Sequence, residues 1–327
     1  MFPQRRMRRS RKRNIQPLLR ESTIVKTDLV APLFVDENLA DPLPIMAMPG
    51  QFRYPVSGIA RVAERLWNQG IRAILLFGIP KNKDPGARSA YDPDGVVQQA
   101  VRKVKAVLPA MVVITDVCAC EYTTHGHCGI VGEMHSGDQD LLNDPSLELM
   151  NQIATSHAEA GADIVAPSCM LDGMVSSIRR ALDDAGFSDV LILSYSTKFA
   201  SALYGPFREA AGSGYSFGDR TTYQLNPGNR REAVLESRMD MEEGADILMV
   251  KPAGLYLDIL ADIATLGLPV AAYQVSGEYS MIKAAAANGW IKERETVFES
   301  LTCIKRAGAD LIITYFAADV CRWLDEE

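Results

Sequence analysis

A chain of 327 residues, of which 47% are hydrophobic and 23% charged, has the composition of a folded globular protein and is long enough for one large α/β barrel. It holds no apolar run near the roughly 20 residues that a membrane-spanning helix needs, and its six cysteines are too irregularly spaced for a disulfide framework. With no apolar leader at its start, the protein is expected to be cytoplasmic.

The first 20 residues are strongly basic. Eight of the 34 Lys and Arg residues precede the first acid, Glu21, so that 26 basic residues oppose 41 acidic ones in the rest of the chain. A basic tail can bind nucleic acid or a membrane, but this one has few aromatic residues to stack on bases and no apolar stripe to enter lipid. We therefore predict that residues 1–20 form an arm that lies on the acidic body of a neighbouring subunit, with no nucleic-acid or membrane partner, and that residues 21–327 form the catalytic domain.

Eight short apolar runs rich in Val, Ile and Leu predict the strands. Nearly all are continuous rather than alternating, which is typical of strands buried on both faces of a parallel sheet. The runs are residues 29–35, 73–79, 111–118, 164–170, 190–196, 247–251, 269–275 and 311–317.

Helical patterns lie between these runs. Three glycines, Gly161, Gly244 and Gly308, open a Gly-Ala-Asp tripeptide before a strand, where the end of a helix is expected. An alternation of eight strands with helices predicts an α/β fold of the (β/α)8 TIM-barrel type, with a doubly wound sheet as the alternative. The predicted helices are residues 58–68, 93–107, 145–160, 174–185, 231–243, 256–266, 279–287, 295–307 and 317–325.

The third predicted strand runs into the sequence DVCACEYTTHGHC, which puts three thiols into thirteen residues. Alternation sends Cys118 and Cys120 to one face, and the following loop can turn Cys128 back towards them. Three thiolates suit zinc and leave one coordination position free for water or substrate, so the pattern predicts a catalytic zinc site. The alternative is three unrelated buried thiols. The nearby His125 and His127 are as often hydrogen-bonding neighbours of a metal as ligands.

A glycine-rich segment, residues 197–229, follows the fifth predicted strand. A loop of this length in a compact domain is usually functional, and its six aromatic residues argue against a disordered surface loop. We predict that it is an active-site lid.

Two lysines stand at the ends of adjacent predicted strands. Lys198 lies just past the fifth strand and Lys251 ends the sixth, so a barrel would bring both amines to one rim. Burial and a neighbouring cation favour the neutral amine, which attacks a ketone to form a Schiff base. The alternative is a pair of surface lysines whose stems extend out of the barrel.

Other polar residues stand at or near the ends of further predicted strands. Ser276 and Tyr315 offer hydroxyl donors for one carboxylate, and Arg208 and Arg220 in the predicted lid offer guanidinium groups for another. The remaining candidates at these strand ends are Asp116, Ser168 and Tyr273. Together they predict a mouth with two amines, two anion sites and a metal ion.

These motifs resemble those of the porphobilinogen synthase family, also called the δ-aminolevulinic acid dehydratase family. The resemblance runs through most of the chain and rests on the cysteine segment and on the sequences SYSTKFAS, YGPFR, VKPAG and YQVSGEY. It implies a (β/α)8 barrel with an extended N-terminal arm, usually in a homo-octamer. It also implies a hydro-lyase that condenses two molecules of 5-aminolevulinate into porphobilinogen, with loss of two waters, in the biosynthesis of haem-type tetrapyrroles.

The resemblance also implies a role for each catalytic candidate. Lys251 would form the Schiff base with the substrate that becomes the propionate side of the product, and Lys198 the one with the acetate side. The catalytic Zn2+ would be bound by Cys118, Cys120 and Cys128.

The substrate-binding and regulatory residues are implied in the same way. Ser276 and Tyr315 would bind the propionate-side carboxylate, and Asp116 and Ser168 would orient the substrate amine. Glu236 matches the carboxylate that binds an allosteric Mg2+ in many relatives. The acetate-side carboxylate would lie against Arg208, Arg220 and Gln224.

Two positions depart from the family pattern. Cys169 stands where relatives usually carry an aspartate, and it could tune the amine environment or be a simple buried thiol. Thr222 stands where some zinc-rich relatives have a further cysteine, so a second zinc held through His127 is not expected.

Two functions from other classes compete with this interpretation. A different lysine-dependent aldolase would explain Lys251 and the barrel, but neither the second lysine nor the cysteines. A zinc-stabilised nucleic-acid-binding protein would explain the basic arm and the cysteines, but neither the lysines nor the lid.

Overall fold

The structure, a computed structural model, describes residues 5–135 and 137–326, so residues 1–4 of the predicted arm and residue 327 of the predicted catalytic domain lie outside it. Eight parallel strands close into a barrel, in which the last strand pairs with the first. In order around the barrel they are β1 (Leu29–Asp36), β4 (Ala73–Ile79), β5 (Val112–Val117), β8 (Ile164–Pro167), β9 (Leu191–Lys198), β10 (Ile247–Lys251), β11 (Val270–Gln274) and β12 (Leu311–Thr314). The predicted (β/α)8 barrel is confirmed and the doubly wound sheet is excluded.

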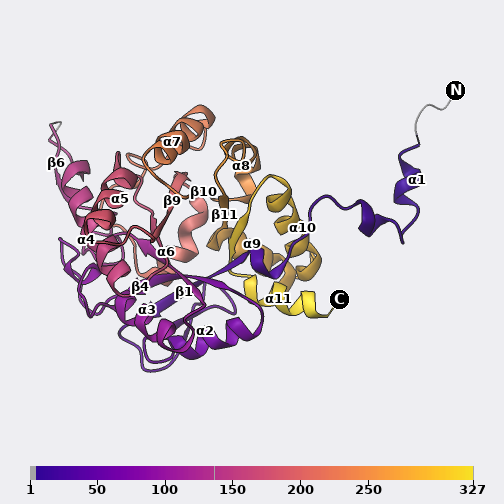
Figure 1. The fold of residues 1–327 in the computed structure, drawn as a ribbon, viewed down its shortest axis with the longest axis horizontal. Coiled ribbons are helices and arrows are strands. Elements are labelled where there is room, and N and C mark those ends of the chain that lie inside the picture. The colour runs from indigo at the N-terminus through magenta and orange to yellow at the C-terminus, as the bar shows by residue number, and fades with distance from the viewer. Residues whose placement is uncertain (1–4, 136, 327) are drawn as a thin grey trace.

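The strands read as continuous apolar runs because both of their faces are covered. Every residue of β1 and of β10 is buried. One face packs inside the barrel and the other packs against the helices, which surround the barrel in Figure 1. The main helices are α2 (Ile59–Asn68), α3 (Val96–Val107), α4 (Asn143–Glu159), α5 (Met174–Asp184), α7 (Arg230–Glu242), α8 (Leu257–Ile263), α9 (Ser276–Ala287), α10 (Glu293–Arg306) and α11 (Ala317–Asp325).

Two predicted strands end earlier than their apolar runs. The run 164–170 stops pairing at Pro167, because Met170 has a φ of 60° and cannot continue an extended chain. The run 311–317 stops at Thr314, whose Oγ1 accepts a hydrogen bond from the backbone N–H of Phe316 at 3.1 Å. This bond turns the chain directly into α11, which begins at Ala317.

The helix predicted from residue 279 begins three residues earlier, at Ser276. The side chain of Glu278 accepts hydrogen bonds from the backbone N–H groups of Val275 and Gly254, both at 2.7 Å. These bonds fix the first turn of α9 at the carboxyl end of β11. Ser276 is thereby held at the rim of the barrel rather than in a preceding loop.

Short elements were not predicted, because they are too short to show a period. The predicted lid is not without structure, since it contains a helix, and the cysteine segment is followed by a small hairpin. The elements are the strands β2 (Leu43–Pro44), β3 (Phe52–Pro55), β6 (Val131–Glu133) and β7 (Gln139–Leu141), the helices α1 (Met7–Ser10) and α6 (Gly205–Ala211), and the 3-10 turns η1 (Gln16–Leu19), η2 (Lys26–Asp28), η3 (Arg88–Ala90), η4 (Ala202–Tyr204) and η5 (Gly254–Tyr256).

The described part of the predicted arm projects away from the barrel, as Figure 1 shows. Neither α1 nor η1 contains a buried residue, and Leu18 is 81% exposed. In the described ranges, every helix is too short or too polar to cross a membrane.

Candidate active site

The carboxyl ends of β9 and β10 bring the two lysines together. β9 continues two residues past its predicted end because its register with β10 shifts, pairing Val250 with Thr197 and Lys251 with Lys198. Lys198 is therefore the last residue of its strand rather than the first residue after it. Both lysines are 5% exposed, which excludes the alternative of surface side chains.

Lys251 is surrounded by aromatic rings. Its Nζ lies 4.3 Å from the ring centroid of Tyr273 and 4.8 Å from that of Tyr195. Burial, followed by repulsion from Lys198, lowers the pKa of Lys251 to about 7. A large fraction of this amine is neutral near pH 7, as a nucleophile requires.

Lys198 has a different electrostatic environment. Its Nζ donates a hydrogen bond to the backbone carbonyl of Ser168 at 2.5 Å. Burial opposes its charge, but attraction to neighbouring groups, first the Cys128 thiolate and then Cys118 and Asp116, together outweighs burial and raises the pKa of Lys198. The predicted neutral amine is therefore found for Lys251, whose pKa is lowered, but not for Lys198, whose pKa is raised.

A carboxyl group from β5 faces the same space. Asp116 accepts a hydrogen bond from the Ser168 hydroxyl at 3.2 Å through one oxygen, and its other oxygen is buried with no partner among the described residues. Burial, followed by the charge of Glu121, raises the pKa of Asp116 to about 7. A buried oxygen without a partner is a position for a donor from a bound molecule.

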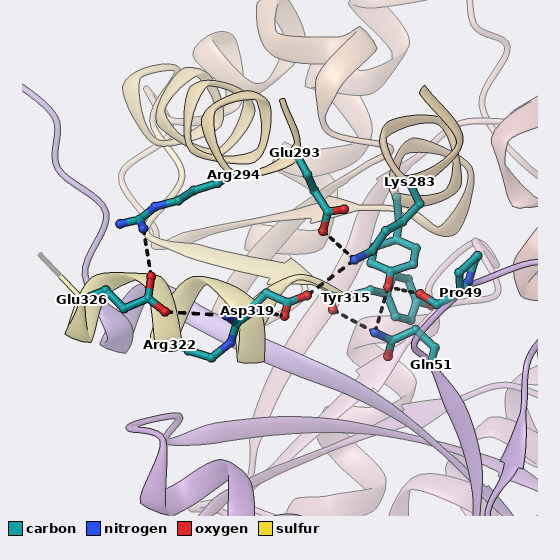
Figure 2. Close-up of polar contacts among 10 residues, drawn as sticks. Pro49, Gln51, Lys283, Glu293, Arg294, Tyr315, Asp319, Arg322 and Glu326 are labelled. Atoms are coloured by element: carbon teal, nitrogen blue, oxygen red, sulfur yellow. Dashed lines mark hydrogen bonds and ion pairs between the residues drawn. The ribbon is translucent and has the colours of Figure 1, made fainter. Parts of the chain in front are cut away.

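Tyrosine and serine hydroxyls complete the rim. The hydroxyl groups of Tyr273 and Tyr315 hydrogen-bond to each other at 3.0 Å. The Ser276 hydroxyl accepts from the backbone N–H of Phe207 at 3.0 Å, which joins α9 to the lid helix α6. Tyr315 is also fixed from behind, as Figure 2 shows, because Gln51 donates to its backbone carbonyl at 3.0 Å.

These side chains enclose one pocket. Its free volume is only about 20 Å³, which is room for about one water molecule. The pocket is lined by Lys198, Tyr204, Phe207, Arg208, Arg220, Lys251, Tyr273, Val275, Ser276 and Tyr315.

Four thiols, rather than the predicted three, gather beside the pocket. The Sγ atoms of Cys118 and Cys120 are 3.3 Å apart, and those of Cys118, Cys128 and Cys169 all lie within 4.8 Å of one another. All four residues are buried. Hydrogen bonds from Cys118, Cys120 and Cys169 lower the pKa of Cys128 well below its usual value. A buried group of sulfur donors around one thiolate fits a soft ion such as Zn2+.

Glu121 also belongs to this cluster, although the sequence did not single it out. Its carboxylate accepts a hydrogen bond from the Cys120 thiol at 3.2 Å, and its other oxygen is buried without a partner in the described part of the chain. Its ligand atom lies within 4.8 Å of those of Cys118 and Cys120. In the sequence, only its position directly after Cys120 indicates that Glu121 could belong to the metal site.

The lid lies directly on the cysteine loop. The Arg220 guanidinium donates to the backbone carbonyls of Gly126 and Ser213, both at 2.9 Å. Gly126 has a φ of 74°, and a Cβ atom there would lie 2.2 Å from the carbonyl oxygen of Gly214 in the lid. Only glycine fits this close approach of two backbones.

His127 holds the lid. Its ring nitrogens lie 3.1 Å from the Tyr223 hydroxyl and 3.1 Å from the Phe217 carbonyl, so both are engaged with the lid. Thr222, in the same segment, donates to Asp140 at 3.1 Å on the surface. Both ring nitrogens of His127 thus contact residues of the lid.

Three side-chain nitrogen donors of the lid have no partner within the described ranges. They are the Nε atoms of Arg208 and Arg220 and the side-chain nitrogen of Gln224, all of them buried. Arg208 and Arg220 line the lysine pocket, whereas Gln224 lines the neighbouring cleft. Buried donors without a partner suit an anion.

Glu236 lies on α7, apart from the lysine pocket. It lines the same cleft as Asp172 and Glu232. Burial, followed by the charges of Asp172 and Glu243, raises the pKa of Glu236 to about 7. Oxygen donors of this kind suit a hard cation, which would lower that pKa again.

One family model, two curated relatives and one solved structure match this chain over nearly its whole length. A family model described as delta-aminolevulinic acid dehydratase matches residues 4–323. The chain is 52% identical to the delta-aminolevulinic acid dehydratase of Archaeoglobus fulgidus over 324 residues, 99% of each chain. It is 53% identical to that of Methanothermobacter thermautotrophicus over 323 residues, 98% of this chain and 97% of the relative. The crystal structure of delta-aminolevulinic acid dehydratase (porphobilinogen synthase) from Toxoplasma gondii ME49, in complex with the reaction product porphobilinogen, matches with a TM-score of 0.95 and 41% identity, covering 99% of this chain and 92% of that one.

Proposed function

The chain belongs to the delta-aminolevulinic acid dehydratase family, and from this we propose that its barrel mouth condenses two molecules of 5-aminolevulinate into porphobilinogen with loss of two waters. The observation that carries the proposal is the direct pairing of Lys198 with Lys251 at the rim of one buried pocket. A one-lysine aldolase would leave Lys198 and the thiols without a role. A nucleic-acid-binding protein would have no use for two buried amines.

Lys251 acts first in this proposal, because its lowered pKa makes it the better nucleophile at neutral pH. Its neutral amine attacks the ketone of one substrate. The C–N bond forms, the ketone oxygen leaves as water, and a Schiff base remains. Ser276 and Tyr315, which line the same pocket, would bind the carboxylate of this substrate, and Tyr273 would orient Tyr315 through their shared hydrogen bond.

Lys198 forms the second Schiff base and must first lose a proton. Asp116 is suited to receive that proton or to hold the substrate amine, because it carries a raised pKa and a buried oxygen without a partner in the described chain. Ser168 holds the other oxygen of Asp116 and so fixes its orientation.

The thiol cluster would hold the metal. Cys118, Cys120 and Cys128 are proposed as ligands of Zn2+, since their buried sulfur donors match its preference for soft tetrahedral coordination. When bound, zinc supplies a Lewis acid that polarises a carbonyl group of the second substrate.

The lid controls access and binds the second carboxylate. A pocket with room for about one water cannot admit 5-aminolevulinate, so the lid must open for binding. On closing over substrate, the unpartnered donors of Arg208, Arg220 and Gln224 would bind the acetate-side carboxylate.

Two further sites belong to the proposal. Glu236, with Asp172 and Glu232 in one acidic cleft, is proposed to bind a regulatory Mg2+. Residues 1–20 are proposed to dock on a neighbouring subunit of a homo-octamer, since neither α1 nor η1 buries a residue against its own chain.

A pyrrole assay tests the reaction. The purified protein, loaded with zinc and incubated with 5-aminolevulinate, should form a product that gives a coloured adduct with an aromatic aldehyde. Treatment with a strong chelator should abolish the colour, and zinc but not magnesium alone should restore it. If the zinc-loaded protein binds 5-aminolevulinate but makes no pyrrole, the proposal is wrong.

A further inference from the structure

Cys169 is the one thiol of the cluster to which the proposed function gives no role. It is fully buried, and its Sγ lies 3.5 Å from the Sδ of Met150 and 3.7 Å from the backbone carbonyl of Val117. The same Sγ lies within 4.8 Å of the sulfur atoms of Cys118 and Cys128. It therefore belongs to the metal cluster by position, although it is 41 residues away from Cys128 in the sequence.

The barrel itself places this thiol. β5 and β8 are adjacent parallel strands, and Val117 pairs with Pro167 at their carboxyl ends. Cys118 follows the first strand directly, and Cys169 lies two residues past the end of the second. Their approach follows from the pairing of two neighbouring barrel strands, because each cysteine lies within two residues of its strand end.

The spacing is close to that of a complete sulfur site. Zinc binds thiolates at about 2.3 Å, so four tetrahedral ligands hold their sulfur atoms roughly 3.8 Å apart. The sulfur atoms of Cys118, Cys128 and Cys169 are already within 4.8 Å of one another. Cys120 lies 3.3 Å from Cys118 in the same cluster. Cys118 is thus close to each of the other three sulfurs, and Cys120, which groups with Cys118 and Glu121, must turn its side chain to join Cys128 and Cys169 on one ion.

We propose that Cys169 is a fourth thiolate ligand, which completes a four-sulfur zinc site with Cys118, Cys120 and Cys128 when no substrate is bound. The inference rests on the metal site of the proposed function. A closed four-thiolate site has no open position, so Cys169 must leave the metal when substrate takes its place. Of the four, Cys169 is the one that leaves, because its neighbour Ser168 contacts both Asp116 and Lys198 and so responds to a bound substrate amine.

X-ray absorption at the zinc edge measures the number of sulfur neighbours directly. The zinc-loaded protein without substrate should show four sulfur neighbours. Cys169→Ser should show three sulfur neighbours and one lighter atom, and so should Cys169→Ala, which tests the same loss without a new hydroxyl. The matched control is Cys321→Ser, which removes an equally buried thiol on α11 and should keep four.

Adding 5-aminolevulinate to the unaltered protein should lower the count from four to three. Three sulfur neighbours in the unaltered protein, unchanged by Cys169→Ser, would overturn the fourth ligand and leave the three-cysteine site intact. A zinc ion with no sulfur neighbour would instead refute the metal site of the proposed function. If the Cys169 variants do not fold, the count in the unaltered protein with and without substrate still decides.

Discussion

At the scale of single residues, the two lysines differ although they are paired in the barrel. Lys251 has aromatic rings around its amine, and burial dominates its pKa. Lys198 lies towards Asp116 and the thiols, and their charges dominate over burial. Neighbouring groups thus shift the pKa values of two identical side chains in opposite directions. This difference favours the proposed order, in which Lys251 reacts first.

The pKa of Lys251 predicts how the first Schiff base depends on pH. Below about pH 7 the amine becomes protonated, and one pH unit lower only about a tenth remains neutral, so the rate of imine formation there should be about tenfold below its plateau at high pH. Borohydride trapping of the imine, followed by mass analysis of Lys251, measures this rate.

Asp116 titrates in the same range and is the control for this prediction. Its charge raises the pKa of Lys251, so Asp116→Asn should shift the pH profile of trapping to lower pH. A profile that disappears in Asp116→Asn, rather than shifting, would show that the measured group is Asp116 and not Lys251.

Arg208 offers a second prediction at the residue scale. Its Nε has no hydrogen-bond partner in the described chain. Arg208→Met therefore removes this donor without breaking a hydrogen bond that Nε makes within the protein. Loss of a charge-assisted hydrogen bond costs about 1.5–3 kcal/mol, and the second substrate should bind roughly 10- to 100-fold more weakly. The control is Arg230→Met, which breaks an exposed ion pair with Asp262.

The readout for Arg208 separates the two substrates. Trapping at Lys251 should be unchanged in Arg208→Met, whereas pyrrole formation should need a higher concentration of 5-aminolevulinate. Equal loss of both steps would mean that the substitution disturbs the fold and that Arg208 has no selective role.

At the scale of elements, the lid and the cysteine loop act as one unit. Arg220 and His127 each cross between them, and the backbones touch at Gly126 and Gly214. Movement of the lid must therefore break contacts with the loop that carries Cys128. Opening of the pocket and the surroundings of the thiol cluster are coupled for this reason.

A pair of glycine variants tests this coupling. Gly126→Ala would push a Cβ atom to 2.2 Å from the backbone of Gly214 and should loosen the lid, with lower pyrrole formation and faster hydrogen exchange at residues 213–217. The matched control is Gly214→Ala, whose Cβ atom meets nothing within 4 Å. Equal exchange rates in the two variants would show that the contact at Gly126 does not hold the lid.

A polar network fixes the elements behind Tyr315, as Figure 2 shows. Lys283 on α9 contacts Glu293 on α10 at 2.6 Å and Asp319 on α11 at 3.7 Å. Arg322 also contacts Asp319, at 2.9 Å. The two ion pairs of Lys283 join α9, α10 and α11 around the strand end that carries Tyr315, and each contributes modestly, about 1 kcal/mol or less.

The sequence was informative where the barrel itself determines position. Lys251 and Cys118 could be placed because each stands at the end of an apolar run, and parallel strands bring such ends to one rim. Cys169 could not be placed beside Cys118, because the predicted strand 164–170 included it, whereas the strand ends at Pro167 and Cys169 lies in the turn beyond it. The contact of Arg220 with Gly126 joins two loops, for which periodicity carries no information.

At the scale of the whole molecule, the described part of the arm packs little against its own chain. α1 and η1 are exposed throughout, and Leu18 and Leu19 are 81% and 50% exposed. Exposed leucines beside a run of basic residues suit a partner that offers both apolar surface and acidic charge, as the acidic body of a second copy would.

Deletion of residues 1–20 should reduce the assembly to smaller species, which static light scattering measures directly. A variant with neutral residues in place of the basic ones at 5–13, but with Leu18 and Leu19 kept, separates charge from apolar contact. We expect this variant to assemble in a manner that no longer depends on salt. An assembly that survives the deletion, together with salt-sensitive DNA binding by the intact protein, would favour a nucleic-acid tail.

The small volume of the closed pocket has a kinetic consequence for the proposed reaction. Each Schiff base releases one water molecule, and the closed pocket has room for about one even before substrates fill it. Water retained beside an imine would hydrolyse it, so the forward direction depends on water leaving the pocket. In the proposed reaction, the closed lid would keep bulk water away from the bound imine and so slow its hydrolysis until the next step, without changing the overall equilibrium of the condensation.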